Sequence, residues 1–581
     1  MDRRHQKRIR IRIVILAFFF FLWAAGLTFR LIQIQVVDHP RLKAQVLHQN
    51  QNKDTILPTR GTIYDRKGKI FARSLPAPSV FLYPFEDETP TAQIEKINKL
   101  KGILNLSYQE IQRIKARTEK GDLFIWIKRK IDQQQAERVK SLRLPGIFLK
   151  MENKRYYPHE NLAAHVLGGV SIDDEGLSGI EWQYNSRLRG KRGERLILRD
   201  AKKREYNFEI LKEPEPGKDL VLAVDETIQY IVEKELKKVI LQHQASWGSV
   251  IVAVPSTGEI LAMANYPTYD PNKYPPSWLE SARNRAIHYN FEPGSTFKIV
   301  TAMAALEANR IALNDTIDCG EGVIHLAGKT IRDHKKFGWL TFPEVIQHSS
   351  NVGAIKIGQL VGESFFFEKM KAYGFGERTG IDLPGEEKGI FRKLRDWSRI
   401  SLASLSFGQE ISVTAVQLLQ TMNTIANRGL VTTPKIVKKI LLSKNEVRER
   451  PSHHKRVLSE KAASAMVKIL ESVVEDGTGT MARINGYRIA GKTGTAQKFD
   501  TKINAYSSVL HTSSFVGFAP VDKPAFSMIV VIDEPKGAYM GGEVAAPLFR
   551  QIAEHLFLYL RIPPQKEGSQ SLITARLRRG H

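Results

Sequence analysis

Two residues near the middle of the chain could carry nucleophilic chemistry. Pro293 and Gly294, a turn-forming pair, precede Ser295, and Lys298 lies three residues further on. The apolar residues that follow at helical spacing predict a buried helix over about 295–309, with Ser295 in its first turn. Residues three apart share a helix face, so the Ser295 hydroxyl and the Lys298 amine can come within hydrogen-bonding reach. Because a serine needs a base and burial lowers the pKa of a lysine, Ser295 is a candidate nucleophile and Lys298 its candidate base.

The Ser-x-x-Lys spacing carries little information by itself. Ser452 and Lys455 repeat it, but they lie in the polar stretch 450–456, where no apolar helix would bury the lysine. We interpret this second copy as a coincidence. Support for Ser295 has to come from further elements that follow it along the chain.

A Ser-x-Asn triplet follows Ser295. Ser349 and Asn351 come directly after an apolar, helix-like stretch at 342–346. Ser443 and Asn445 repeat the spacing, but this copy precedes the second Ser-x-x-Lys pattern instead of following it. The order of the elements therefore favours the triplet at Ser349.

The third pattern, Lys492-Thr493-Gly494-Thr495, occurs once and lies inside a predicted strand at 489–498. Strand alternation places Thr493 and Thr495 on one face, and Gly494 has no side chain to obstruct the backbone of a substrate. The strand thus offers hydroxyls, an ammonium and backbone N–H groups together. This combination suits a substrate that ends in a carboxylate and whose neighbouring carbonyl is attacked.

Length and composition limit the possible classes. A chain of 581 residues predicts about two to four domains. The net charge of +26 is dispersed, and no zinc spacing, recognition helix or aromatic RNA motif accompanies it, which argues against nucleic-acid binding. An anionic lipid surface or acidic polymer fits the charge equally well. Cys319 is the only cysteine, so an intramolecular disulfide and a cysteine-based metal cluster are excluded, and we expect no cofactor.

The N-terminus predicts a membrane anchor. Lys and Arg cluster in residues 3–12, before an uncharged apolar run at 13–29 that further apolar residues extend to 34. A helix of this length can span a bilayer. A cleaved signal peptide is the alternative, because Ala24, Ala25 and Gly26 are small, but the apolar run is long for one and continues past them. We expect the basic segment in the cytoplasm and everything after about residue 38 outside.

The region 35–218 predicts a mixed, extended arm. Residues 60–68 read as a strand and turn, with 69–72 as the returning strand of a hairpin, and helices are predicted at 91–104 and 133–141. No metal or nucleotide motif appears, so we interpret the arm as structural.

The region 219–562 predicts an α+β domain. An amphipathic helix at 225–244 precedes apolar strands at 248–254 and 259–264, which a turn joins into a hairpin. The remaining predicted elements are a mainly helical centre, three strands and a closing helix, at 295–476, 489–498, 513–519, 525–532 and 545–560. Strands at both ends with helices between them predict one sheet of about five strands covered by helices. The basic tail 563–581 is expected to be disordered.

The ordered triple Ser295-x-x-Lys298, Ser349-x-Asn351 and Lys492-Thr493-Gly494 resembles the signature of penicillin-binding proteins and serine β-lactamases. The anchor and two stretches of the arm resemble the pedestal of class B members, which are monofunctional peptidoglycan transpeptidases. The stretches that carry this further resemblance are 60–68, 176–181, 380–385 and 406–409. The Ser-Ser-Asn and Lys-Thr-Gly-Thr forms resemble the cell-division type more than the elongation type.

The resemblance implies the organisation of the chain. It predicts a cytoplasmic segment, a transmembrane anchor, a dimerisation-like pedestal domain, a transpeptidase domain of the serine β-lactamase type and a tail, at 1–12, 13–34, 35–218, 219–562 and 563–581. It also implies a bacterial inner-membrane protein with one span and its catalytic domain outside.

The resemblance further implies two acyl transfers. Ser295, deprotonated by Lys298, attacks the penultimate carbonyl of a stem peptide ending in D-Ala-D-Ala. Ser349 and Lys492 pass a proton to the departing D-alanine, while Asn351 orients Lys298 and holds the substrate amide. An amine of a neighbouring stem peptide then attacks the acyl-enzyme and completes the cross-link.

The same resemblance assigns the groups that hold the donor. Backbone N–H groups of Ser295 and Thr495 form the oxyanion hole. The hydroxyls of Thr493 and Thr495, beside Gly494 and with the charge of Lys492, bind the terminal carboxylate. β-Lactams mimic the donor and are expected to acylate Ser295.

Several alternatives stay open. An elongation-type transpeptidase or a D,D-carboxypeptidase would use the same acylation, the latter with water as acceptor. A β-lactamase is disfavoured because no Glu-x-x-Leu-Asn stretch of the class A type is present. A β-lactam sensor or a silent scaffold of the division machinery is the non-enzymatic reading.

The resemblance also implies partners. No glycosyltransferase signature lies between the anchor and residue 219, so a separate membrane glycosyltransferase and other division proteins are expected to bind the anchor and pedestal. Lys335, Lys336, Arg483 and the polar segment 500–508 are candidates for the rim of the cleft, but we favour solvated surface for them.

Overall fold

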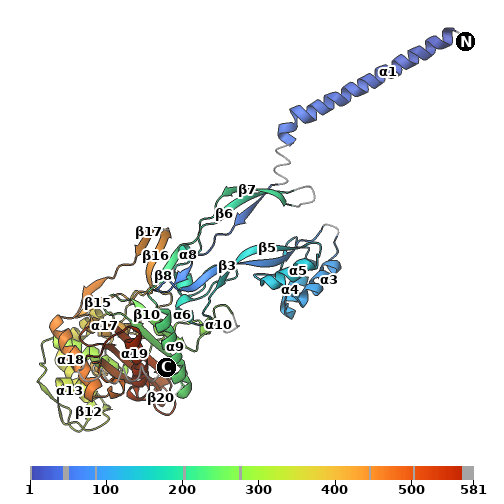
Figure 1. Cartoon of the computed structure of the whole chain (residues 1–581). Coiled ribbons are helices and arrows are strands. Elements are labelled where there is room, and N and C mark those ends of the chain that lie inside the picture. The colour runs from blue at the N-terminus through green and yellow to red at the C-terminus, as the bar shows by residue number, and fades with distance from the viewer. Residues whose placement is uncertain are drawn as a thin grey trace. The chain divides into compact units, whose positions relative to one another are not determined.

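The computed structural model describes residues 3–42, 51–85, 88–199, 205–273, 278–443, 446–500 and 504–565 (Figure 1). It divides into two compact units, one made of Met1–Pro58 and Gly190–Pro216 and the other of Thr59–Arg189 and Gly217–His581. From residue 566 on, the basic tail lies outside the described residues, so its predicted disorder stays a prediction.

The first unit holds the apolar helix and a small sheet. Helix α1 (Arg3–Ile32) continues into the π-helical turn η1 (Gln33–Val37), so the basic residues form its first turns and do not precede it. Within the described ranges, the stretch Gln6–Val37 is the one helix long and apolar enough to cross a membrane, and none of its most apolar window is buried. Three antiparallel strands in the order β1-β6-β7 complete the unit, at Gln51–Ile56, Gly193–Arg199 and Glu205–Lys212.

The pedestal part of the second unit is built on a long hairpin. The predicted hairpin is confirmed, since β2 (Ile63–Tyr64) pairs with the start of β3 (Ile70–Leu82). Beyond that point β3 pairs with β5 (Ile147–Tyr156) and with the short β4 (Ile125–Lys128). Three helices cover these strands, α3 (Pro90–Lys101), α4 (Tyr108–Glu119) and α5 (Gln133–Ser141).

Helix α4 is absent from the sequence predictions, although its start carries a signal. The Ser107 hydroxyl accepts the N–H of Glu110, and the Glu110 carboxylate accepts the N–H of Ser107, which is a capping box. Each side chain satisfies a backbone donor that the helix itself leaves without a partner.

The catalytic part contains the predicted five-stranded sheet, with the order β10-β9-β21-β20-β19 and antiparallel pairing throughout. Its strands are β9 (Trp247–Ala253), β10 (Ile260–Tyr266), β19 (Ala490–Asp500), β20 (Ala505–Ala519) and β21 (Phe526–Asp533). Strand β20 begins well before its predicted start at 513, because β19 and β20 extend beyond the sheet as a hairpin that pairs Phe499 with Tyr506.

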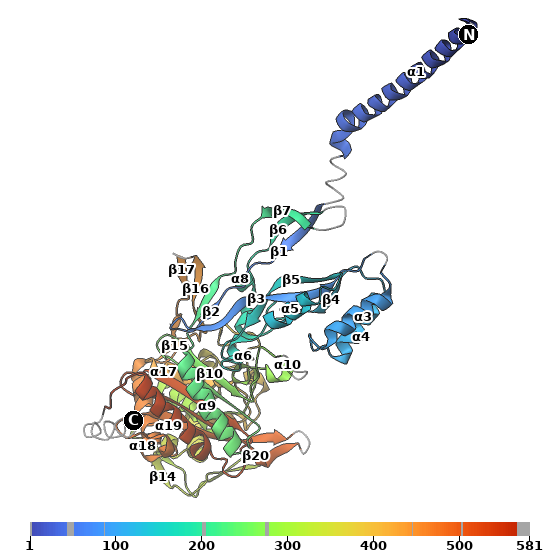
Figure 2. The same ribbon diagram turned by 45° about the vertical axis from the view of Figure 1, so that its right-hand side comes forward.

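Alternation along the strands divides the core in two. On β21, Met528 and Val530 face one apolar cluster, whereas Ile529 and Val531 face the other. The first cluster includes α9 (Glu226–Gln242) and α19 (Gly541–Tyr559), which lie side by side on their face of the sheet (Figures 1 and 2). The second is filled by the central helices, among them α12, α14, α17 and α18, at Lys298–Glu307, Asn351–Val361, Ala415–Ala426 and Glu460–Asp476.

The centre of the domain is less purely helical than predicted. Besides its helices it contains short two-stranded sheets, such as the pair of β12 (Val323–Leu326) and β13 (Lys329–Arg332). This hairpin leads directly into the loop that reaches the candidate site.

Candidate active site

The candidate nucleophile lies in a tight turn before the buried helix. Ser295 belongs to the 3-10 turn η2 (Gly294–Phe297). Helix α12 (Lys298–Glu307) therefore begins three residues after the predicted start at 295 and ends two residues before the predicted end at 309. A backbone hydrogen bond holds this turn in place, because Gly294 donates its N–H to the carbonyl oxygen of Gly408 at 3.1 Å. Ser295 itself stays half-buried.

A carboxylate just before the nucleophile also fixes this turn. Glu292 Oε1 accepts the N–H of Glu410 and the hydroxyl of Tyr506, each at 3.0 Å. Tyr506 belongs to the polar segment 500–508, for which the sequence favours solvated surface. The prediction is wrong for this residue, because the β19–β20 hairpin brings it back over the turn.

Lys298 is completely buried, as predicted. Burial lowers the pKa of Lys298 to about 7, against the opposing effect of the Asp333 carboxylate. Its Nζ atom lies 2.5 Å from the carbonyl oxygen of Ser349, 3.2 Å from Ser349 Oγ and 2.8 Å from Asn351 Oδ1. Among the contacts of the described residues there is no hydrogen bond from Lys298 to Ser295 Oγ, so the predicted pairing is absent from this state.

The Ser-x-Asn triplet occupies a strained corner between two helices, α13 (Phe342–Gln347) and α14. Ser349 has φ +62°, a left-handed conformation that a residue with a side chain adopts only when its surroundings require it. Ser350 is the N-cap of α14, and its hydroxyl accepts the N–H of Gly353 at 2.9 Å. The corner therefore holds Ser349 and Asn351 toward Lys298.

Lys492 completes the arrangement from strand β19. It is fully buried, and its Nζ atom lies 3.0 Å from Ser349 Oγ. Burial sets the pKa of Lys492 well below its usual value, and the charge of Lys298 lowers it further. Ser349 Oγ thus lies between two buried amines from distant parts of the chain.

The threonines of β19 lie at its contact with α19. Thr493 Oγ1 lies 2.7 Å from Thr478 Oγ1, and Thr495 Oγ1 accepts the N–H of Gly541 at 2.9 Å. Turn η2 abuts the same strand, since a Cβ on Gly294 would lie 2.8 Å from the carbonyl oxygen of Thr495. The two backbone segments predicted to form the oxyanion hole are therefore neighbours.

The glycine of this strand is also required by packing, which the sequence did not indicate. A Cβ on Gly494 would lie 2.4 Å from Ser514 Oγ and 2.7 Å from the methyl of Thr296. Packing between the strand and the turn that carries Ser295 thus requires glycine here as well, and its predicted role in admitting a substrate stays a prediction.

Two residues at the site escaped the sequence analysis. Asp333 accepts the Ser350 hydroxyl at 2.6 Å, and the carbonyl of Arg332 accepts the side-chain amide of Asn351 at 2.8 Å. The signal was weak, because a single Asp-containing loop some distance before a helix start predicts no contact. The family stretch 406–409 contributes Gly408, described above, and the stretch 380–385 contributes Asp382, which accepts the N–H groups of Ile436 and Val437.

The second Ser-x-x-Lys pattern and three of the rim candidates behave as interpreted. Ser452 donates to the carbonyl of Thr257 and accepts Lys435 Nζ, so it does not pair with Lys455. The triplet copy at 443–445 falls partly outside the described residues. Three rim candidates are exposed, namely Lys335, Lys336 and Arg483. In the described ranges, no group of three His, Cys, Asp or Glu side chains could hold a metal ion.

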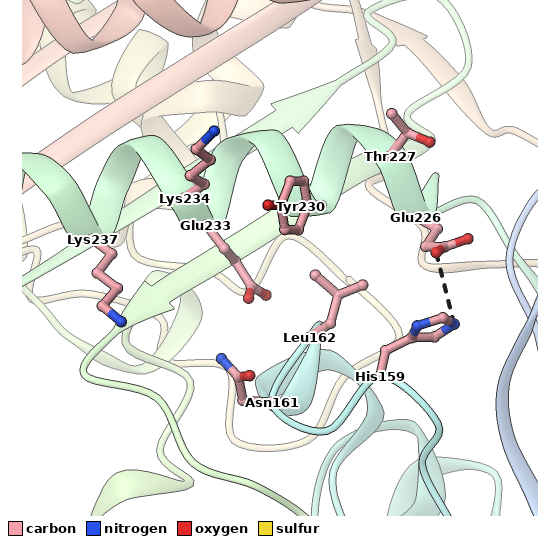
Figure 3. Close-up of a pocket in the computed structure, with 9 residues that line it drawn as sticks. All are labelled: His159, Asn161, Leu162, Glu226, Thr227, Tyr230, Glu233, Lys234 and Lys237. Carbon is pink, nitrogen blue, oxygen red and sulfur yellow. Dashed lines mark ion pairs between the residues drawn. The ribbon is translucent and has the colours of Figure 1, made fainter.

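A cavity of about 530 Å³ lies elsewhere, between α9 and the loop after β5 (Figure 3). Its lining comprises His159, Asn161, Leu162, Glu226, Thr227, Tyr230, Glu233, Lys234 and Lys237. None of these belongs to the three motifs. The cavity is therefore separate from the candidate site of acyl transfer.

Comparison with known proteins agrees with the geometry. The penicillin-binding protein transpeptidase domain matches residues 248–554, and the penicillin-binding protein dimerisation domain matches residues 55–222. Stage V sporulation protein D of Bacillus subtilis (strain 168) is 36% identical over 521 residues, covering 88% of this chain and 79% of that protein. Peptidoglycan D,D-transpeptidase FtsI of Escherichia coli (strain K12) is 32% identical over 571 residues, covering 97% of this chain and 94% of its own length.

A solved structure supports the same assignment. Penicillin-binding protein 3 of Mycobacterium tuberculosis, complexed with aztreonam, superposes with a TM-score of 0.70 at 27% identity, covering 88% of this chain and 98% of that one. One family thus accounts for both domains and for nearly the whole length of the chain, and residues of its three motifs lie together in the structure. This chain belongs to the class B penicillin-binding proteins and is a peptidoglycan D,D-transpeptidase.

Proposed function

We propose that the protein cross-links stem peptides through an acyl-enzyme on Ser295, in septal wall synthesis at cell division. The observation that carries the chemistry is the position of Ser349 Oγ, 3.2 Å from Lys298 Nζ and 3.0 Å from Lys492 Nζ. Because the Ser349 hydroxyl lies between two buried amines, it can pass a proton from the attacking Ser295 oxygen, by way of Lys298, to the nitrogen of the leaving D-alanine.

In the first transfer, neutral Lys298 takes the proton of Ser295 Oγ as that oxygen bonds to the carbonyl carbon of the penultimate D-alanine. The base is available near neutral pH, because burial lowers the pKa of Lys298 to about 7. Its contact with Ser295 forms when substrate is bound, as catalytic hydrogen bonds commonly tighten only in the complex. Asn351 Oδ1 keeps the amine oriented meanwhile.

Collapse of the tetrahedral intermediate breaks the peptide bond. The nitrogen of the terminal D-alanine takes a proton from the Ser349 hydroxyl, which Lys492 or Lys298 reprotonates. The second transfer reverses these roles. A stem-peptide amine attacks the ester carbon, gives its proton back through the same groups, and releases Ser295 with its hydroxyl restored.

Binding of the donor rests on β19. Backbone N–H groups of Ser295 and Thr495 would bind the oxyanion, where a single donor of this kind is typically worth about 3 kcal/mol. The donor carboxylate would lie along Thr493 and Thr495, close to the charge of Lys492. β-Lactams present the same carboxylate and an activated carbonyl, so we expect them to acylate Ser295.

The division role is supported by two observations of different kinds. The Ser349-Ser350-Asn351 and Lys492–Thr495 forms resemble the cell-division type, and the relative FtsI aligns over 94% of its length. The relative named for stage V of sporulation makes a sporulation role the second candidate. Elongation and D,D-carboxypeptidase activity are further alternatives for the same site.

The proposed setting is one membrane span with the catalytic part outside. Helix α1 carries a cluster of basic residues at its N-terminal end and only Arg30 in its last turn, and the end with the larger basic cluster stays on the cytoplasmic side. We further propose that a membrane glycosyltransferase binds the anchor and pedestal. Co-purification of the full-length chain from detergent tests this, and repeated absence of such an enzyme counts against it.

Three measurements test the activity. Fluorescent penicillin should label the purified full-length protein, with the label on the peptide that contains Ser295, and Ser295→Ala should abolish it. With a D-Ala-D-Ala donor and an amine acceptor, cross-linked dimer should exceed product formed by water, whereas mainly hydrolysed donor would indicate a carboxypeptidase. Growth of normal septa in cells that carry only Ser295→Ala would indicate a scaffold.

A further inference from the structure

We propose that Asp333 is a positioning residue for acyl transfer, which clamps the start of α14 so that Asn351 and Ser349 stay aimed at Lys298. The inference rests on the proposed function of Ser295 and Lys298, and it extends that function to a residue outside the three motifs. Asp333 directly follows β13, in the loop that reaches the site.

The Asp333 carboxylate binds the first turn of α14 with both oxygens. Oδ2 accepts the Ser350 hydroxyl at 2.6 Å, while Oδ1 accepts the backbone N–H of Asn351 and, at 3.2 Å, that of Val352. These backbone donors have no partner inside the helix, and a negative charge is favoured at this end. The clamp therefore fixes Ser350, Asn351 and Val352, the residues that link Ser349 to the rest of α14.

The neighbouring Arg332 completes a bracket around Asn351. Its carbonyl accepts Asn351 Nδ2 at 2.8 Å, which leaves Asn351 Oδ1 for Lys298 Nζ, also at 2.8 Å. Two adjacent residues of one loop thus hold Asn351 by its backbone N–H and by its side-chain amide. Rotation of that amide would turn an N–H donor toward the lysine and remove an acceptor from it.

Strain at Ser349 explains why a clamp is needed. Its left-handed φ of +62° persists only if the surroundings hold it, and its carbonyl oxygen is a partner of Lys298 Nζ at 2.5 Å. Without the carboxylate, the corner can relax and both acceptors move away from the amine. Asp333 also acts on the base through its charge, which opposes the fall in the pKa of Lys298.

The test uses the full-length protein in detergent and measures the rate of labelling by fluorescent penicillin from pH 5 to 9. We expect Asp333→Ala to lower the plateau rate about 10- to 100-fold, because misplacement by about 1 Å has effects of this size. Asp333→Asn keeps the shape of the side chain but removes the charge, so the midpoint of the pH profile should move to lower pH. A merely structural residue would not move that midpoint.

A double variant tests whether Asp333 acts through Asn351. If it does, Asp333→Ala slows labelling by a smaller factor in the Asn351→Ala background than in the native protein, and the remaining loss reflects Ser349. The matched control is Asp318→Asn, a nearby carboxylate that accepts the N–H of Gly320 at 2.8 Å and should leave rate and midpoint unchanged.

The outcomes separate this proposal from the proposed function. Absence of labelling in the native protein contradicts the function itself. Native labelling with an unchanged rate and midpoint in both Asp333 variants overturns the clamp, as does an additive loss in the double variant. If Asp333→Ala does not fold, the pH midpoint of Asp333→Asn decides.

Discussion

Ser349 Oγ lies 3.0 Å from the Nζ atom of Lys492, although the two residues come from a loop and a strand far apart in the chain. Lys492 and Lys298 are both fully buried on either side of that hydroxyl. Because like charges repel strongly when water is excluded, the two amines do not readily carry a charge together. We therefore expect the pair to share one proton, which in the proposed relay passes to a substrate through the Ser349 hydroxyl.

Replacing Ser349 by Ala or by Gly tests this relay. Both changes remove the hydroxyl, and we expect each to slow penicillin labelling about 100-fold, the effect of losing general acid–base catalysis. Glycine also relieves the left-handed backbone at this position, so the Gly variant should be more stable than the Ala variant by about 1 kcal/mol. Labelling rates and thermal unfolding measure the two effects. Fast labelling by the Gly variant alone would show that the backbone, and not the hydroxyl, is what matters.

The basicity of Lys298 sets a pH dependence. Its pKa of about 7 means that the neutral amine, the form that can accept the Ser295 proton, disappears as pH falls below that value. We expect the labelling rate to be flat above pH 8 and to fall about tenfold per pH unit well below the pKa. Lys298→Arg should lose activity at every pH, because a guanidinium does not deprotonate. A flat native profile from pH 5 to 9 would exclude Lys298 as the base.

Sequence patterns predicted those helices and strands whose own residues show a clear hydrophobic periodicity or an apolar run. Strands such as β21 are nearly continuous apolar runs, and α9 shows its buried face in the spacing of Ile228, Val232 and Leu236. The three motifs could likewise be recognised, because each is a short pattern in a fixed order. The structure brings Lys298, Ser349, Asn351 and Lys492 together as predicted.

The features that were missed depend on contacts between distant segments. Ser295 lies in a 3-10 turn because Gly294 is tied to Gly408, and no local pattern encodes that contact. The role of Asp333 likewise appears only when the β12–β13 hairpin is placed beside the start of α14. The packing role of Gly494 was missed for the same reason, since Ser514 and Thr296 meet it only in the folded domain.

The contact between Gly408 and Gly294, the residue before Ser295, can be tested by substitution at Gly408. This glycine has φ +86°, and a Cβ there would lie 2.2 Å from the carbonyl oxygen of Gly294. Gly408→Ala should therefore displace the turn that carries Ser295, destabilising the domain by about 2 to 4 kcal/mol and slowing penicillin labelling strongly. Thermal unfolding and labelling rates measure both effects.

Gly328 provides the matched control. Its φ is +79°, similar to that of Gly408, but a Cβ there would meet nothing within 4 Å. Gly328→Ala should lose only about 1 kcal/mol through its backbone conformation and should label normally. Equal effects of the two substitutions would show that the backbone strain, rather than the contact with Gly294, is responsible.

A buried ion cluster supports the pedestal. Glu181 is fully buried and accepts Arg60 Nε at 2.7 Å and Arg155 Nε at 2.6 Å. Burial alone would raise the pKa of Glu181, but the charges of Arg155 and Arg60 hold it below its usual value. Glu181→Gln leaves two buried guanidinium groups without a counter-charge, so we expect a loss of about 3 to 5 kcal/mol in thermal unfolding.

The control for Glu181 is an exposed ion pair of the same part of the protein. Glu95 and Lys99 lie 3.0 Å apart with 70% and 55% of their side chains exposed. Glu95→Gln should change stability by less than about 0.5 kcal/mol, as exposed pairs contribute little. A similar small effect of Glu181→Gln would mean that the cluster does not stabilise the pedestal.

Glu233, in the cavity between α9 and the loop after β5, predicts a pH-dependent stability (Figure 3). Burial raises the pKa of Glu233 to about 7 from the usual 4.5, although its Oε1 accepts the N–H of Ala163 at 2.8 Å and Gln229 Nε2 at 2.7 Å. Between pH 4.5 and about 7 the folded state keeps a proton that the unfolded state has released. The free energy of unfolding therefore falls as the pH rises through this range, and the loss is complete above a pH of about 7. Glu233→Gln keeps an oxygen acceptor without the charge. Its Tm should exceed that of the native protein by about 2 to 4 °C at pH 8 and match it at pH 5, whereas Tm values that run parallel between these pH values would contradict the raised pKa.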